Sequence, residues 1–268
     1  MDRLVFTILA TTVFAVFSFY FYYKSGSHNK KLFREAITAN VFTVTFIAPL
    51  VGAALFAAMI SVIFTESNRE TFFRSDVVLL TLMFYLYGLY SVSQGMHALA
   101  KAFKPEVIRV MDKKLVSLLY FFHGPFSHYG SNFSLILIFC LFLVYNVNHP
   151  GRHPIAGFDL LVVVSCGLVL GIALACEAVI SNMVKSLRWF FLILFILLSL
   201  YEKNSKATLL HSPLSILVLT SFGVATVILF LDRLGPKRNW FYKRVDRFFV
   251  SVNKDWDDIF LSLKTKTS

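Results

Sequence analysis

Long apolar runs separated by short polar stretches dominate the pattern of this sequence. Five runs of about 20 residues or more occupy residues 4–23, 40–64, 77–100, 158–182 and 210–231. An α-helix rises about 1.5 Å per residue and the hydrocarbon core of a bilayer is about 30 Å thick, so each run is long enough to cross a membrane. The pattern therefore predicts five secure transmembrane helices.

Two further apolar runs, residues 131–147 and 187–201, are shorter. They lie near or below the usual minimum of about 17 residues, so they cross fully only if the bilayer thins or their flanks contribute. Counting both gives about seven spans. The sequence then predicts an all-α, polytopic transmembrane helix bundle over residues 1–234, followed by a basic tail over residues 235–268.

The basic residues predict the orientation of this bundle. If the N-terminus faces outside, the loops on the cytoplasmic side hold 20 of the 26 Lys and Arg residues and the other loops hold six. Cytoplasmic loops are enriched in Lys and Arg, so an N-out/C-in topology is expected. Omitting either short span would invert every later loop, which supports counting both.

Composition and charge narrow the class of protein. With 57% hydrophobic and 15% charged residues, the chain is too apolar for a soluble domain. The net charge of +11 lies in the loops, at the level of lipid headgroups, so we expect anionic headgroups as partners and no nucleic acid. Short loops and compactness favour the inner (plasma) membrane of a bacterium.

Two segments are amphipathic rather than uniformly apolar. Residues 104–122 carry apolar residues at helical spacing and are expected to form a helix on the inner leaflet. After Gly235 and Pro236 a second apolar stripe begins at Phe241, and its polar face carries Lys243, Arg244 and Arg247. This tail either anchors on anionic headgroups or docks a cytoplasmic protein partner; association with a second copy of the chain also stays open.

The fifth expected span carries a charge and a small-residue motif. Acidic residues inside spans are costly and often functional, and Glu177 is the clear case here. It is a candidate for a proton or cation relay; the alternative is a carboxylate paired with Lys185, Arg188 or a polar group. Gly167 and Gly171 form a Gly-x3-Gly motif that permits close helix packing, so this span is expected at the centre of the bundle.

The densest polar cluster lies before the fourth expected span. His123 and His128 flank Gly124 and Pro125, which are expected to break the helix, and His97 lies at the same depth in the third span. Three imidazoles can bind a transition metal such as zinc, with an open position for catalysis. The alternative is a set of interfacial histidines that form local hydrogen bonds.

Two short stretches are similar to sequence elements of membrane enzyme families. Ser93-Gln-Gly-Met-His97 is similar to the Ser-x3-His element of the seven-span alkaline ceramidase and progestin-receptor superfamily, but the last expected span lacks that family's His-x3-His pair. The stretch from Arg152 to Gly157 resembles part of the isoprenylcysteine methyltransferases, without their tyrosine or Glu-Glu pair. Each match covers a few residues, so the sequence assigns no family.

Two functional hypotheses follow. The first is a non-enzymatic transporter, channel or membrane subunit of a complex, and the sequence favours it because the spans offer one clear buried charge and no established catalytic spacing. The second is a membrane-embedded, metal-dependent enzyme that acts on a lipid-like substrate at the cytoplasmic face. That hypothesis requires the imidazoles of His97, His123 and His128 to converge beside an apolar cleft.

Overall fold

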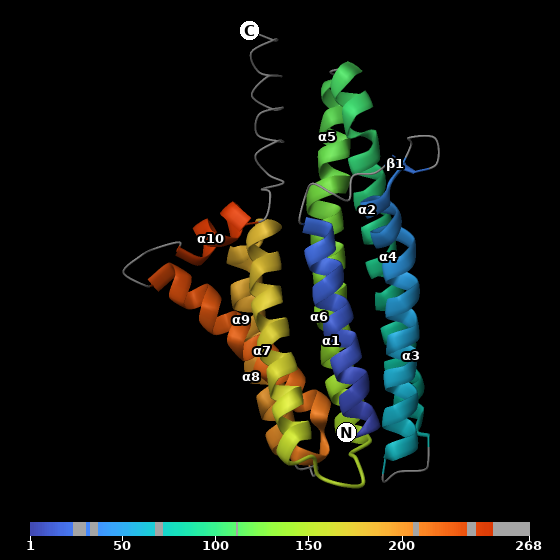
Figure 1. Cartoon of the computed structure of the whole chain (residues 1–268), viewed down its shortest axis with the longest axis vertical. Coiled ribbons are helices and arrows are strands. Elements are labelled where there is room, and N and C mark those ends of the chain that lie inside the picture. Colours follow the sequence, from blue (N-terminus) through green and yellow to red (C-terminus); the bar gives the residue numbers. More distant parts are fainter. Residues whose placement is uncertain are drawn as a thin grey trace.

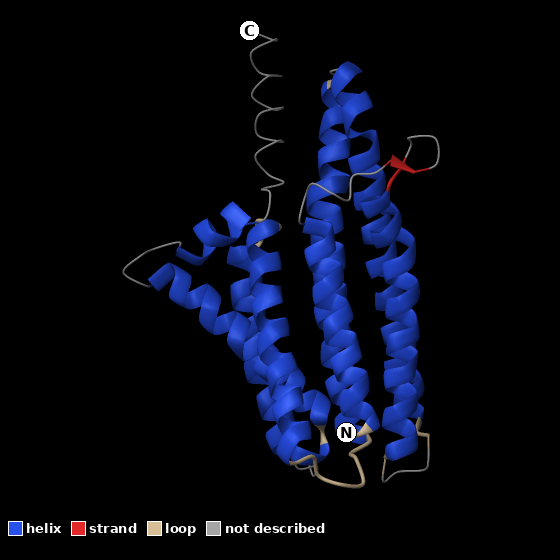
Figure 2. Cartoon of the chain, viewed as in Figure 1, coloured by secondary structure: helices blue, strands red, loops and turns tan. Residues whose placement is uncertain are grey.

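The computed structural model describes residues 1–23, 31–32, 37–67, 72–110, 112–205, 209–234 and 240–248. Helices make up almost all of these residues (Figure 2). Two strands of two residues each, β1 (Lys31–Leu32) and β2 (Ile37–Thr38), pair in an antiparallel arrangement. The helical elements are α1 (Arg3–Tyr23), α2 (Ala39–Phe42), η1 (Thr43–Ile47), α3 (Ala48–Glu66), α4 (Arg74–Val110), α5 (Lys113–Phe121), η2 (Phe122–Phe126), α6 (Ser127–Asn148), α7 (Gly157–Ile180), α8 (Val184–Asn204), η3 (Leu209–His211), α9 (Pro213–Leu234) and α10 (Trp240–Phe248).

Seven of the described helical segments are long and apolar enough to cross a membrane. The prediction of an all-helical chain with about seven helices that could span a membrane is therefore confirmed, which is compatible with a multi-pass membrane protein. The two short apolar runs belong to full-length helices, because α6 has 22 residues and α8 has 21. Both helices continue past their apolar runs into polar residues, whose backbone hydrogen bonds the helix satisfies internally.

The spans form two neighbouring groups (Figure 1). The first consists of α7, α8 and α9, and the second of α3, α4 and the continuous α5–η2–α6 segment. Between them, α1 packs against both α7 and α3, while α6 also contacts α9. Met1 lies at one end of the bundle, and α10 and the tip of α5 lie toward the other (Figure 1).

Helices α7 and α9 approach each other closely at the two glycines of the Gly-x3-Gly motif. A Cβ atom built on Gly167 would lie 2.7 Å from Cβ of Thr220, and one built on Gly171 would lie 2.7 Å from the backbone oxygen of Ser221. A side chain at either position would overlap α9, so both glycines set the distance between the helices. Because α7 also contacts α1, α8 and α10, it occupies a central place in the bundle.

The expected single helix over residues 104–122 is wrong. Its first part continues α4 to Val110, and the chain then reverses into α5. Asp112 starts the new helix, since its Oδ1 accepts a hydrogen bond from the backbone N–H of Leu115 at 2.8 Å. A side-chain cap of this kind satisfies a backbone donor that has no partner within the helix.

The expected helix break at Gly124 and Pro125 is also wrong. These residues lie in the π-turn η2, which joins α5 to α6 without interruption. Proline has no backbone N–H and its ring crowds the preceding turn, and the wider π-turn accommodates both defects while the helix continues. The hydroxyl of Ser127 donates to the carbonyl of Phe122, five residues earlier, within this turn.

The end of the bundle near Met1 is closed by contacts between loops. Ser67 pairs with Gly151 in a β-bridge, and the Gly151 N–H donates to the His211 carbonyl at 2.8 Å. Asp76 and His149 are both fully buried there, with Oδ2 and Nε2 3.0 Å apart. His149 therefore belongs to the core at this end of the bundle, although it follows α6 in a loop between two spans.

Candidate functional site

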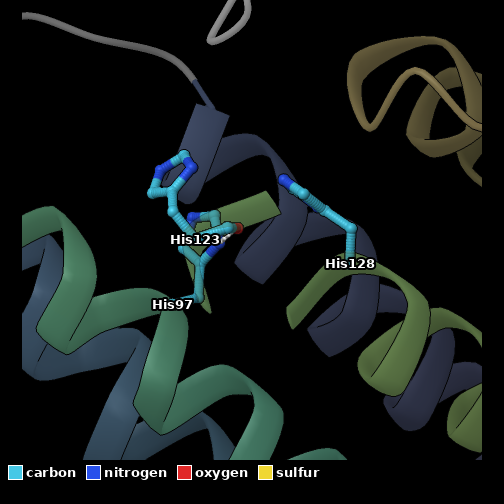
Figure 3. A group of neighbouring side chains, drawn as sticks. All are labelled: His97, His123 and His128. Atoms are coloured by element: carbon cyan, nitrogen blue, oxygen red, sulfur yellow. Dashed lines mark hydrogen bonds between the residues drawn. The ribbon is translucent and has the colours of Figure 1, made fainter. Parts of the chain in front are cut away.

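The imidazoles of His97, His123 and His128 converge at the end of the bundle opposite Met1. One ligand nitrogen from each ring lies within 4.8 Å of the other two (Figure 3). The ring centroids of His97 and His123 are 4.3 Å apart, and those of His97 and His128 are 5.0 Å apart. The exposed fractions of 5%, 4% and 8%, in the same order, show that the whole cluster is buried.

The π-turn explains how two histidines five residues apart face the same partner. In an α-helix, residues five apart lie about 140° apart around the axis, so His123 and His128 would point to different neighbours. A π-turn adds a residue to the turn and stacks residues five apart. Because η2 ends at Phe126, just between the two histidines, it turns both toward His97 on α4.

A hydrogen bond orients the His97 ring. Its Nδ1 lies 3.0 Å from the backbone carbonyl oxygen of His123. A carbonyl only accepts, so Nδ1 carries the proton and the lone pair of the neutral ring lies on Nε2. Metal-binding histidines are usually held in this way, with the second ring nitrogen donating to a carbonyl or carboxylate.

Gly130 sets the spacing between the two helices that carry the histidines. A Cβ atom built on Gly130 would lie 2.1 Å from Oγ of Ser93. Ser93 is fully buried on α4, one turn before His97, and Gly130 follows His128 by two residues on α6. Cβ of Ser93 would also lie 3.1 Å from that position, so α4 and α6 approach closely at the level of the cluster.

Glu177 lies beside the histidine cluster, although the sequence analysis proposed it as a separate functional site. Its Oε1 is 3.9 Å from Nδ1 of His128. The side-chain amide of Asn132 donates to the same oxygen at 3.4 Å. Packing of the bundle therefore brings the two predicted sites together as one. Asn132, which the sequence did not single out, is also part of this site.

A cavity of about 210 Å³ adjoins the cluster and is surrounded by α1, α3, α4, α6, α7 and α9. One end is polar and the remainder is mostly apolar. The polar end is lined by Gln94, His97, Ser127, His128, Ser131, Asn132 and Glu177. The apolar part includes Phe14, Leu55, Phe56, Leu135, Phe139, Leu170, Leu174, Leu217 and Phe222.

The cavity reaches about halfway through the bundle. Along α6 it extends from His128 to Phe139, eleven residues that span about 16 Å at helical rise. Beyond this point Phe142 and Leu143 are fully buried in the core. Half of a hydrocarbon core of about 30 Å is about 15 Å, so the depth of the cavity matches one leaflet.

The helix α10 is attached to the same end of the bundle. Asp232 accepts a hydrogen bond from the backbone N–H of Phe241 at 2.7 Å, near the start of α10. Val245 is buried and clusters with Val179 and Ile180 of α7. Lys243 and Arg244 are exposed. Arg247 lies in α10 but its side chain is outside the described residues, as is the chain after residue 248.

A buried carboxylate on α8 was missed by the sequence analysis. Glu202 lies near the C-terminal end of α8, is 9% exposed, and accepts a hydrogen bond from the Ser215 hydroxyl at 2.8 Å. The expected span ended at residue 201, so Glu202 was assigned to a loop. Only the packing of α8 against α9 shows that it is buried.

Comparison with family models, curated proteins and solved structures finds no match for this chain. The function is therefore argued from the site itself.

Proposed function

We propose that this protein is a membrane-embedded, zinc-dependent hydrolase in which His97, His123 and His128 hold the metal and Glu177 is the general base. The observation that carries the proposal is the convergence of three buried imidazoles and a carboxylate at the polar end of an apolar cavity. Three protein ligands with a fourth position open are the usual arrangement of catalytic zinc.

Each group has a role in hydrolysis. Zinc held by three imidazoles acidifies water and polarises a carbonyl group. Glu177 accepts the proton of the attacking water, and the Asn132 amide holds the carboxylate in place beside His128. The cavity keeps bulk water from the apolar part of a substrate. The buried ligands and the nearby carboxylate thus supply a metal, a base and a binding space.

Metal binding requires a modest contraction of the cluster. Tetrahedral zinc with bonds of about 2.0–2.1 Å places its ligand nitrogens about 3.4 Å apart. The three nitrogens lie within 4.8 Å of one another, so side-chain rotations have to bring them closer.

A transporter, channel or complex subunit is the second candidate, as the sequence favoured. The observation in its support is that buried carboxylates occur at both ends of the bundle, with Asp232 at the α10 end and Asp76 and Glu202 near the other. The hydrolase accounts better for the three imidazoles. It also fits a cavity that extends only to Phe139, above the fully buried Phe142 and Leu143.

The orientation and location remain part of the proposal. An N-out/C-in topology in the bacterial inner membrane would place the histidine cluster at the headgroup level of the cytoplasmic leaflet. Exposed Lys243 and Arg244 on α10 would then face anionic headgroups. The substrate would enter from that leaflet, in agreement with a lipid-like molecule.

Metal analysis of the detergent-purified protein by plasma mass spectrometry tests the proposal. We expect about one zinc per chain in the wild type, loss of the metal in His123→Ala/His128→Ala, and retention in His153→Ala. His153 is the matched control because it is exposed at the other end of the bundle. A wild-type protein that takes up no zinc even after zinc is supplied would overturn the hydrolase.

A further inference from the structure

We infer that the cavity binds one acyl chain of a lipid and that the scissile bond is the ester or amide that joins this chain to its headgroup. The cleavage rests on the proposed hydrolase function, whereas the binding of the chain rests on the cavity alone. The inference is based on a mostly apolar cavity that is about as deep as one leaflet. The polar end of this cavity lies at the histidine cluster and Glu177.

The lining of the cavity fits a hydrocarbon chain. Side chains from six helices surround it, and beyond its polar end they are mostly Phe, Leu and Ala. An apolar chain placed there gains contacts that water cannot make. The histidines and the carboxylate of the lining gather at one end, and the rest of the lining offers only neutral side chains such as Thr11 and Ser221. An amphiphile therefore fits with its polar group at His128 and its chain directed toward Phe139.

The depth of the cavity predicts the length of the chain. The distance from His128 to Phe139 is about 16 Å along α6. An extended polypeptide advances about 3.5 Å for every three backbone bonds, and an extended hydrocarbon has similar bond geometry. About 14 bonds therefore fill the cavity, which corresponds to an acyl chain of about 14 carbons.

Phe139 forms part of the floor that limits this length. It lines the cavity at the far end of the α6 segment, and the next core residues along the helix, Phe142 and Leu143, are fully buried. Removal of the Phe139 ring would extend the space toward that core. Leu174 lines the wall on α7, where a larger side chain would shorten the space.

Cleavage at the acyl bond balances as a hydrolysis. The oxygen of water bonds to the acyl carbon while the bond from that carbon to the headgroup oxygen or nitrogen breaks. The proton that Glu177 removes from water passes to the leaving oxygen or nitrogen. A fatty acid stays in the cavity and the headgroup alcohol or amine leaves from the polar end, so no redox partner is needed.

The test is displacement of a fluorescent fatty acid by saturated fatty acids of 8 to 18 carbons, with the full-length protein in nanodiscs. We expect the affinity to rise about fourfold per methylene, which corresponds to about 0.8 kcal/mol, and to level off near about 14 carbons. Phe139→Ala should move this plateau to longer chains and Leu174→Phe to shorter ones. Phe84→Ala, on the lipid-facing surface of α4, should change neither.

The opposite shifts of the two cavity variants keep the test decisive even if one of them folds poorly. Affinity that does not depend on chain length, or a plateau that neither variant moves, would overturn the inference. Zinc measured in the same samples separates the two claims. A plateau without zinc would overturn the hydrolase and the cleavage while the lipid site stands, and zinc without a plateau would overturn the lipid site alone.

Discussion

Nδ1 of His128 lies 3.9 Å from Oε1 of Glu177, although the two residues belong to different helices and are 49 positions apart in the sequence. This contact joins a partly buried carboxylate to a cluster of potential zinc ligands. A carboxylate beside a metal site can accept a proton from a metal-bound water and so act as a general base. A carboxylate alone within a span has no such water to activate. The first prediction therefore concerns this pair.

Glu177→Gln should separate metal binding from catalysis. The amide is nearly isosteric with the carboxylate, and its oxygen can still accept the hydrogen bond from Asn132, but it cannot take a proton from water. We expect the zinc content to stay unchanged and the rate of acyl-bond hydrolysis to fall by about 10²- to 10⁴-fold. Metal analysis and a hydrolysis assay on one preparation measure both. An unchanged rate would exclude Glu177 as the base.

Gly130→Ala should weaken the metal site through the packing of α4 and α6. The added methyl group would overlap Oγ of Ser93 and crowd its Cβ at 3.1 Å, so the hydroxyl has to rotate and the helices move slightly apart. Overpacking of this kind costs about 1–3 kcal/mol of stability, and we expect a lower thermal midpoint and weaker zinc binding. The measurements are thermal unfolding in detergent and zinc titration.

A second substitution provides the control for this prediction. Ser93→Ala removes the clashing hydroxyl, so the double variant Gly130→Ala/Ser93→Ala should recover part of the lost stability and zinc affinity. Additive losses in the double variant would show that the contact between these two residues does not set the helix spacing.

Lys243→Ala/Arg244→Ala should reduce the preference of the protein for anionic lipid. Each basic residue near a membrane surface contributes about 1 kcal/mol, so the two together account for about a 30-fold change in affinity. Retention of phosphatidylglycerol over phosphatidylcholine by the purified protein is the measurement. Lys203→Ala, an exposed lysine at the other end of the bundle, is the matched control. If the wild type, the double variant and the Lys203→Ala control all retain phosphatidylglycerol equally, α10 is not a headgroup-binding helix.

Labelling with a membrane-impermeant maleimide tests the orientation. In an N-out/C-in protein, a cysteine at His153 should react in intact cells and one at Lys113 should react only after the membrane is opened. Both positions are exposed, and they lie near opposite ends of the bundle. The native cysteines at 140, 166 and 176 are replaced by alanine to remove background. The reverse pattern would invert the topology and place the histidine cluster outside.

The sequence by itself determined the helical class and the number of helices long enough to span a membrane, and it predicted a common depth for the main candidate residues. Run length is a local property that the thickness of the bilayer fixes, so even the short run at residues 187–201 was recognised as a span. The alternation of basic loops supported that count. Depth follows from the distance to a span end, which is why His97, His123 and His128 were expected at one level.

Only the tertiary structure decided which faces of the helices meet. The sequence spacing of His123 and His128 points to different sides of an α-helix, and the π-turn at Pro125 turns them to one side. Gly130 brings α4 close enough for His97 to join them, and the packing of α6 beside α7 adds Glu177. Helix rotation and contact depend on side-chain packing between segments far apart in the chain, which hydrophobic periodicity within one segment does not encode.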